Sequence, residues 1–336
     1  MKLVRGVKYA GVGLLLAALS APGQAATTVL NVSYDVAREF FKDYNVAFEQ
    51  YWKGQGGDGL TINQSHGGSS KQARAVADGL EADVVTLNQD NDIDFLADKG
   101  LLPQDWQKQF KYNSSPYSST MVFLVRAGNP KKIHDWNDLL RNDVKVIIPN
   151  PKTSGNGRYS FLAAWTYALK EKGGNEAKAK DFVQKLFHNV PVLDTGGRAA
   201  TTTFVQRGIG DVLVTFENEV YLTQKEFGAD KVDIVYPAVS IAADLPVAVV
   251  QKYADKHGTT KTAQAYLGYL YSPAGQELAA RHFLRPRDPA VFQRYATVFH
   301  PIRLYTVRDV FGSWDALQKK FFDDGGVFDQ IYVPGK

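Results

Sequence analysis

The sequence predicts an α/β fold with parallel sheets, and two observations lead to this class. Runs rich in β-branched residues alternate with longer segments of helical periodicity, which is the pattern of strands joined by crossover helices. The links between them are rich in Gly, Ser and Asp. The clearest unit is a strand at residues 144–148, a loop at 149–157 and a helix that we expect to begin at Tyr159 and to stop at Gly173.

The same pattern recurs along the chain. Strands are expected at residues 29–33, 60–64, 82–87, 118–126, 144–148, 190–194, 211–215, 232–236 and 245–250. Helices are expected at 36–52, from 71 to a stop at Gly79, from 94 to Gly100, from 198 to Gly208 and from 216 to Gly228, and the chain from Thr260 on reads as mainly helical. The run at 118–126 is long enough to cross from one domain to another.

Length and composition favour two domains. The chain has 336 residues, which is long for a single domain, and its apolar content of 44% with both charge signs interspersed is typical of an ordinary globular protein. We therefore expect two hydrophobic cores.

The first 25 residues have the features of a cleavable signal peptide. Lys2, Arg5 and Lys8 precede an apolar run at 10–21, and small residues follow it up to Ala25. The run is shorter than the roughly 20 apolar residues of a membrane span. With no cysteine in the chain, disulfides and lipidation at a signal-peptide cysteine are excluded, so export to a bacterial periplasm is expected.

The charge of the mature chain gives no support to nucleic acid binding. Cleavage after Ala25 removes three basic residues and no acidic one, so the formal net charge of +4 becomes +1. No block of Lys or Arg remains to contact phosphates.

Motifs of enzymes, metal sites and nucleotide sites are missing from the sequence. No Gly-x-Ser-x-Gly elbow occurs, and residues 67–71 lack its second glycine. No window matches a zinc His-Glu-x-x-His pair or a P-loop. Residues 90–94 imitate the start of a calcium loop, but Phe95 and Leu101 occupy the positions of its glycine and glutamate. We expect a non-enzymatic protein without metal or cofactor.

Five loops can converge where the carboxyl ends of the strands meet. They lie at Ser33, Gly67, Ser154, Gly196 and Phe216. Uncharged backbone donors in such loops suit an anion, although ordinary turns between strand and helix have the same composition. Basic side chains flank the loops, and they can steer an anion or simply form a solvated face: Lys71, Lys152, Arg158 and Arg198.

Several stretches together resemble one family. They are residues 31–35, 64–72, 119–126, 134–139, 149–155, 207–213 and 271–273. In this combination the chain from Leu30 to the C-terminus resembles the periplasmic sulfate-binding and thiosulfate-binding proteins of ABC importers. The resemblance implies a two-lobe type II periplasmic binding fold, with mixed, mostly parallel sheets, flanking helices and crossover strands as the hinge.

The resemblance also implies lobe boundaries and site residues. Residues 26–117 would begin lobe 1, 118–241 would form lobe 2, and 242–336 would complete lobe 1, with C-terminal helices that can pack on lobe 2. The oxyanion would be held between the lobes by backbone N–H groups and serine hydroxyls of Asp35, Ser69, Ser154, Gly155, Asn156 and Gly197. Asp35 is expected to act through its backbone, because its carboxylate would repel an anion.

Two positions depart from the sulfate-binding pattern. Phe216 stands where that pattern has a tryptophan whose indole N–H reaches the anion, and Asn156 stands in place of a glycine. The thiosulfate-binding branch looks similar at Phe216, which has no side-chain donor. We therefore expect the residue at position 216 to decide between sulfate and thiosulfate as the preferred ligand.

The function implied is capture of sulfate or thiosulfate by a monomeric periplasmic protein that delivers it to an inner-membrane ABC permease. A site made only of donors would reject protonated phosphate, because a P–OH group needs an acceptor. Phosphate, molybdate or another oxyanion is the alternative ligand. A secreted hydrolase of phosphate or sulfate esters is the alternative from another class.

Overall fold

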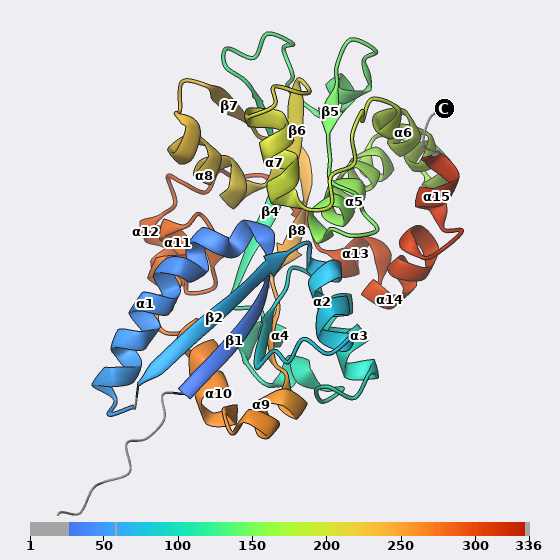
Figure 1. Ribbon diagram of the computed structural model, residues 1–336. Helices are drawn as coiled ribbons and strands as arrows, with labels where there is room; N and C mark the ends of the chain where they lie inside the picture. The colour runs from blue at the N-terminus through green and yellow to red at the C-terminus, as the bar shows by residue number, and fades with distance from the viewer. Residues whose placement is uncertain (1–26, 58, 333–336) are drawn as a thin grey trace, which may run out of the picture.

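The computed structural model describes residues 27–57 and 59–332. These residues form two lobes, each built around one β-sheet with helices on its faces (Figure 1). The expected signal peptide, residues 1–25, lies outside the described residues. Among the described helices, none combines the length and apolar character needed to cross a membrane.

Each lobe has one mixed sheet. The first sheet contains, in order across the sheet, β2 (Leu60–Gly67), β1 (Thr27–Tyr34), β3 (Val84–Thr86) and β9 (Val247–Val249). The second contains β11 (Arg303–Tyr305), β8 (Val239–Asp244), β4 (Tyr117–Arg126), β6 (Val212–Phe216) and β5 (Val146–Ile147), and β7 (Val232–Val235) and β10 (Arg285–Pro286) also pair with β4.

Helices cover both sheets. Those of the first half of the chain are α1 (Arg38–Gly54), α2 (Ser69–Ala77), α3 (Asp90–Asp98), α4 (Lys111–Ser114), α5 (Gly155–Lys170), α6 (Glu176–His188), α7 (Gly197–Val205) and α8 (Glu217–Phe227). They are followed by α9 (Gln251–His257), α10 (Thr260–Tyr269), α11 (Pro273–Arg281), α12 (Pro289–Arg294), α13 (Val307–Phe311), α14 (Trp314–Leu317) and α15 (Val327–Ile331). Short 3₁₀ helices span Asp35–Ala37, Trp106–Lys108 and Trp136–Leu140, and a π turn spans Gln318–Phe322.

Strand register brings the starts of several helices to the space between the lobes. In the first sheet, β1 pairs in parallel with β2 and β3, with Tyr34 opposite Gly67 and Ser33 opposite Thr86. Parallel strands end at the same edge of a sheet, so α2 and the segment that leads into α3 begin side by side. In the second sheet β5 and β6 are also parallel, and α5 and α8 follow them.

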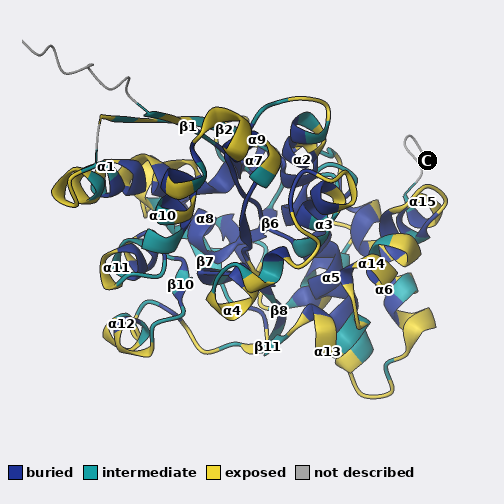
Figure 2. Ribbon diagram, turned by 90° about the horizontal axis from the view of Figure 1, so that it is seen from below, coloured by how far each residue is buried: buried dark blue, intermediate teal, exposed yellow. Residues whose placement is uncertain are grey.

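The long strand β4 lies at the centre of the second sheet. It pairs antiparallel with β6, β7, β8 and β10, so antiparallel pairings outnumber parallel ones there. The expected long strand at 118–126 is thus confirmed. Both sheets are mixed as expected, but the second sheet is not mostly parallel. Buried strands lie between helices whose outer faces are exposed (Figure 2).

Helix α5 is buried on almost all sides, because the C-terminal segment packs on it. The Trp165 and Phe161 rings lie 4.7 and 5.4 Å from the ring of Phe321. Lys152, in the loop before α5, pairs with Asp329 at 2.8 Å. The C-terminal helices therefore contact the second lobe.

Three expectations about secondary structure are wrong. The helix expected from residue 94 begins at Asp90. The helix expected from residue 159 begins at Gly155, because the Ser154 side chain caps it by accepting the Gly157 N–H. Residues 190–194 form no strand. The Asn150 N–H donates to the Asp194 carbonyl, and the Val146 N–H donates to the carbonyl of Asn189, just before this segment. An apolar run alone does not separate a strand from an extended loop.

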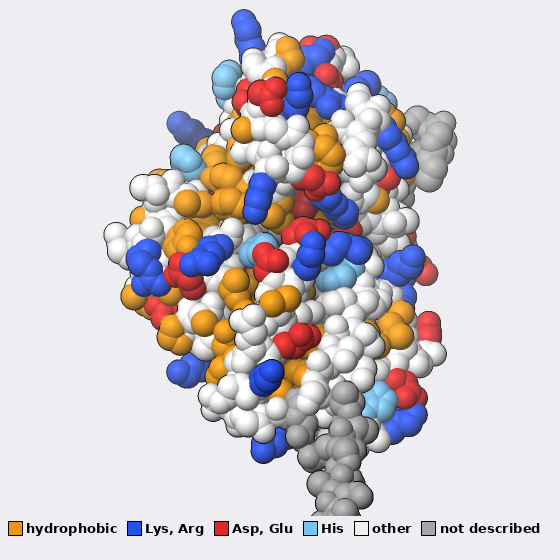
Figure 3. All heavy atoms as spheres, turned by 60° about the vertical axis from the view of Figure 1, so that its left-hand side comes forward, with side chains coloured by type: hydrophobic (Ala, Val, Ile, Leu, Met, Phe, Trp, Pro, Cys, Tyr) orange, Lys and Arg blue, Asp and Glu red, His pale blue; other side chains and the backbone are white. Residues whose placement is uncertain are grey.

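On the face of the molecule shown in Figure 3, Lys and Arg side chains are mixed with Asp and Glu side chains. The same mixing appears in the ion pairs of the described residues, such as Lys256 with Glu81 and Arg294 with Glu277. This face therefore offers no single-sign patch.

One surface cluster makes stability depend on pH. His257, at the end of α9, contacts Glu81 at 3.0 Å and Asp83 at 2.9 Å, and Asp83 also accepts the Leu30 N–H at 2.7 Å. The Asp83 and Glu81 carboxylates raise the pKa of His257. A raised pKa stabilises the fold fully below about 6.5, the pKa of a free imidazole, and this contribution is lost as the pH rises through the folded value.

We therefore expect His257→Gln to lower the melting temperature at pH 6 and to have little effect at pH 9. Thermal unfolding followed by circular dichroism at both values measures this. His188→Gln, at the exposed end of α6, is the matched control. An equal loss at both pH values would contradict an electrostatic role for His257.

Candidate functional site

Three helix N-termini meet between the lobes. Helix α2 begins in the first lobe, just after Gly68, and α5 and α7 begin in the second lobe. A methyl group added at the Cα of Gly68 would lie 2.6 Å from the carbonyl oxygen of Thr153 and 2.7 Å from that of Thr195. The first lobe therefore touches the loops that precede both helices of the second.

The first turns of these helices present buried backbone N–H groups. The residues concerned are Ser69, Gly155, Asn156 and Gly197, all of them buried. None of the hydrogen bonds among the described residues uses their backbone N–H groups. The first N–H groups of a helix have no partner inside the helix, and the helix dipole adds positive partial charge there. Unpaired N–H groups with positive partial charge are the features that suit an anion.

The starts of α5 and α7 are in close contact. A methyl group at the Cα of Gly197 would lie 2.7 Å from Asn156 Nδ2 and 2.9 Å from Val36 Cγ1. The Asn156 side chain itself donates to Thr215 Oγ1 at 2.7 Å. Its backbone N–H is therefore the group that remains for a ligand, as a glycine at this position would also provide.

The two predicted serines differ in what their hydroxyls can do. Ser69 Oγ donates to Asp92 Oδ2 at 2.6 Å and accepts the Asn88 N–H at 3.3 Å, so its proton is committed. Ser154 Oγ accepts the Gly157 N–H at 3.4 Å, which leaves its proton free to donate. Ser154 can therefore bind an anion through its hydroxyl, whereas Ser69 offers only its backbone N–H.

The carboxylate of Asp35 crosses from the first lobe to the second. Oδ2 accepts the Arg198 N–H at 2.9 Å, in the first turn of α7, and Oδ1 accepts the Val36 N–H at 3.1 Å. Burial raises the pKa of Asp35, and the bond from the Arg198 backbone opposes this shift. The acidic side chain is thus occupied by protein donors, and a ligand-binding role for the Asp35 N–H stays a prediction.

A second carboxyl lies near the start of α7. Glu219 Oε1 accepts from Thr201 Oγ1 at 2.6 Å and lies 3.4 Å from Arg198 Nη1. Burial raises the pKa of Glu219 to about 7. Arg198 is therefore paired with Glu219 and with Glu226, in contrast to the solvated or steering role considered from the sequence.

Phe216 forms an apolar wall beside the donors. It is fully buried at the end of β6, and its ring meets Tyr34 at 6.3 Å and Tyr159 at 5.7 Å in edge-on contacts. The Tyr34 hydroxyl is buried and has no hydrogen-bond partner among the described residues. The sequence pattern gave no sign of this hydroxyl, because its position depends on packing between the lobes.

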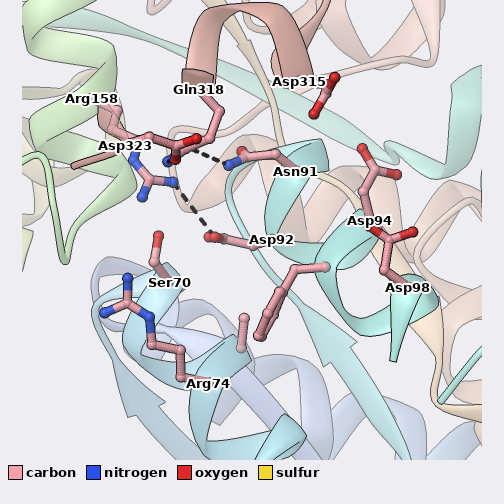
Figure 4. A pocket seen from close by; sticks show the side chains of 12 residues that line it. Ser70, Arg74, Asn91, Asp92, Asp94, Asp98, Arg158, Asp315, Gln318 and Asp323 are labelled. Carbon is pink, nitrogen blue, oxygen red and sulfur yellow. Dashed lines mark hydrogen bonds and ion pairs between the residues drawn. The ribbon is translucent and has the colours of Figure 1, made fainter. Parts of the chain in front are cut away.

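A buried ion pair connects the lobes behind Ser69. Arg158 of α5 lies 3.6 Å from Asp92 of α3, and Arg158 Nε donates to the Pro151 carbonyl at 2.9 Å. The two side chains point toward one another across a pocket of about 310 Å³ (Figure 4). Across the same pocket, Asn91 donates to Gln318 at 3.2 Å. Arg158 thus forms a buried ion pair between the two lobes, and its charge is not on the solvated surface.

The fold and this cleft agree with a known family. The family described as bacterial extracellular solute-binding protein matches residues 30–285. The chain belongs to this family. The thiosulfate-binding protein of Pseudomonas aeruginosa is 57% identical to it over 318 residues, which are 94% of this chain and 96% of the relative. The sulfate-binding protein of Escherichia coli is 53% identical over 96% of this chain and 98% of the relative.

A solved structure supports the same assignment. The sulfate-binding protein SubI from Mycobacterium tuberculosis superimposes with a TM-score of 0.80 at 33% identity, and the match covers 88% of this chain and all of that one. The expected two-lobe binding-protein fold is confirmed. Since these relatives are named as binding proteins, this solute-binding protein has a non-enzymatic role.

Closing of the two lobes should depend on the absence of a side chain at Gly68. We expect Gly68→Ala to hold the lobes apart, because the added methyl group meets two backbone carbonyls of the second lobe, which cannot rotate away. Losing two charge-assisted bonds from one lobe corresponds to about 3 to 6 kcal/mol, a loss in affinity of at least about 100-fold.

Calorimetry with ligand and small-angle X-ray scattering test this expectation. Gly268→Ala is the matched control, because a methyl group there meets nothing within 4 Å. Unchanged affinity and a ligand-induced compaction equal to wild type in Gly68→Ala would contradict the close approach at this residue.

Proposed function

We propose that this solute-binding protein captures sulfate or thiosulfate between its lobes. The observation that carries the proposal is the set of buried N–H groups without acceptors at the starts of α2, α5 and α7. A dianion stripped of water needs dense compensation, and N–H groups from both lobes provide it together with positive partial charge. The printed names of the relatives from Pseudomonas aeruginosa and Escherichia coli support this ligand class.

Backbone N–H donors at the starts of α2, α5 and α7 favour an oxyanion that has lost all its protons. Phosphate esters retain a proton near neutral pH, with a second pKa of roughly 6, and a P–OH group buried without an acceptor costs about 1 to 3 kcal/mol. The Asp35 carboxylate already accepts two backbone N–H groups. We infer discrimination against phosphate on this basis, and the alternative ligands phosphate and molybdate become outcomes of the test.

Transport by an ABC importer completes the proposed role. The protein would act as a monomer in the periplasm after cleavage behind Ala25, and deliver the anion to an inner-membrane permease. A 69-residue stretch is 46% identical to a sulfate/thiosulfate import ATP-binding protein of Cucumis sativus, which covers 20% of each chain and supports this partner class. We retain lobe boundaries near residues 118 and 242 as part of the proposal.

Isothermal titration of the mature protein against sulfate, thiosulfate, phosphate and molybdate tests the ligand. The proposal would be refuted if phosphate binds with submillimolar affinity and neither sulfate nor thiosulfate binds. Hydrolysis of a chromogenic sulfate or phosphate ester, abolished by Ser154→Ala, would instead revive the hydrolase alternative.

The two serines provide a sharper prediction. Ser154→Ala should weaken binding by about 1.5 to 3 kcal/mol, or roughly 10- to 150-fold, because a hydroxyl donor to a charged ligand is lost. Ser69→Ala should cost less, since its hydroxyl proton is bonded to Asp92 and its backbone N–H is retained. Calorimetry on both variants checks the order, and a larger loss for Ser69→Ala would contradict the assignment.

Phe216 should influence the choice between the two anions. An indole N–H at this position would add a donor that suits sulfate, whereas the aromatic face of Phe216 suits the larger, softer sulfur of thiosulfate. We expect Phe216→Trp to shift the affinity ratio toward sulfate. Competitive titration with both anions measures the ratio, and an unchanged ratio would count against a ligand contact at Phe216.

A further inference from the structure

Asn88 places a buried carboxamide at the edge of the cleft. It follows β3 at the carboxyl end of the strand and is 2% exposed. Its backbone N–H donates to Ser69 Oγ at 3.3 Å, and the preceding Leu87 N–H donates to the Pro246 carbonyl at 3.0 Å. The backbone of Asn88 is therefore fixed beside the start of α2.

The side chain of Asn88 reaches across to the second lobe. A methyl group added at the Cα of Gly155 would lie 1.8 Å from Asn88 Oδ1, 2.6 Å from Cγ and 2.9 Å from Nδ2. The carboxamide thus lies against the first residue of α5. Its oxygen lies closest to the position of the added methyl group, and Nδ2 lies farther from it.

No protein group satisfies this carboxamide. Oδ1 is buried without a hydrogen-bond partner. No hydrogen bond among residues 27–57 and 59–332 uses Nδ2, and this nitrogen is not among the fully buried unpaired atoms, so it remains accessible to a ligand. The nitrogens of other buried amides are paired, since Gln89 Nε2 donates to Ser70 Oγ at 3.0 Å and Asn189 Nδ2 donates to two carbonyls at 2.9 Å, although Gln89 Oε1 is also buried without a partner. Buried polar groups are normally paired, and an unpaired one costs about 1 to 3 kcal/mol.

We propose that Asn88 is an additional ligand-binding and specificity-determining residue, which donates its Nδ2 N–H to the oxyanion when the lobes are closed. This inference rests on the function proposed above. A neutral amide donor has the same chemistry as the backbone N–H groups around it. It also supplies a side-chain donor to a site in which Phe216 has none.

The location explains why this donor depends on closure. Asn88 belongs to the first lobe, whereas the Gly155 surface that orients its amide belongs to the second. In an open arrangement the carboxamide would lose that surface and gain water as a partner. A ligand that Asn88 contacts therefore favours the closed state.

Calorimetry of Asn88→Ala, Asn88→Ser and Asn88→Asp with sulfate and with thiosulfate tests the inference. We expect at least a tenfold loss in Asn88→Ala for one anion or both, and a ratio of the two affinities that differs from wild type. If the alanine variant does not fold, Asn88→Ser replaces it in the same measurement. Asn88→Asp keeps the shape but replaces the donors with a charged acceptor, so we expect its loss to exceed that of Asn88→Ala.

Asn189→Ala is the matched control, because it removes a buried carboxamide of the second lobe that lies outside the predicted ligand-binding residues and bonds to the Leu139 and Arg141 carbonyls. It should melt at a lower temperature and bind both anions as wild type does. In labelled protein, the Asn88 side-chain N–H resonances should shift when either anion is added.

The outcomes separate this inference from the function on which it rests. If wild type binds an anion and Asn88→Ala binds it within a factor of two, with unmoved Asn88 side-chain resonances, the inference is overturned and the proposed function stands. If wild type binds neither sulfate nor thiosulfate, the proposed function itself fails.

Discussion

The close approach of the two lobes at Gly68 is the constraint on which the rest of the site depends. Only a residue without a side chain allows the start of α2 to meet the carbonyls of Thr153 and Thr195. This approach brings the N–H groups of α2 opposite those of α5 and α7. The parallel strands set the direction of each helix, and the glycine contact sets how near the helices come to one another.

Charge at the site is balanced by pairing within the protein. The carboxylate of Asp35 accepts backbone N–H groups, and Asp92 is shared between the hydroxyl of Ser69 and the guanidinium of Arg158. No Lys or Arg side chain is among the donors we assign, so the positive potential comes from helix ends. The same bonds join the lobes, which ties the electrostatics of the site to its closure.

The alternation of strands and helices and the long central strand β4 could be predicted from the sequence. The loops before α2 and α5 could be found because small residues follow a strand there, the loop before α7 because small residues follow an apolar run, and the family resemblance supplied their residues. The helix start at Gly155 was missed, because glycines at a capped first turn read as loop. Which serine has a free proton, the burial of Arg158 and the position of the Asn88 amide could not be predicted, since each depends on contacts across the two lobes.

Backbone N–H groups are retained when one side chain replaces another, with proline as the exception. A site built mainly from the first turns of helices therefore tolerates substitution at most of its positions. Heritable variation in ligand choice is then confined to the few positions where a side chain reaches the cleft. In a site of this kind, most substitutions in the sequence of the binding loops change the affinity for the anion only slightly.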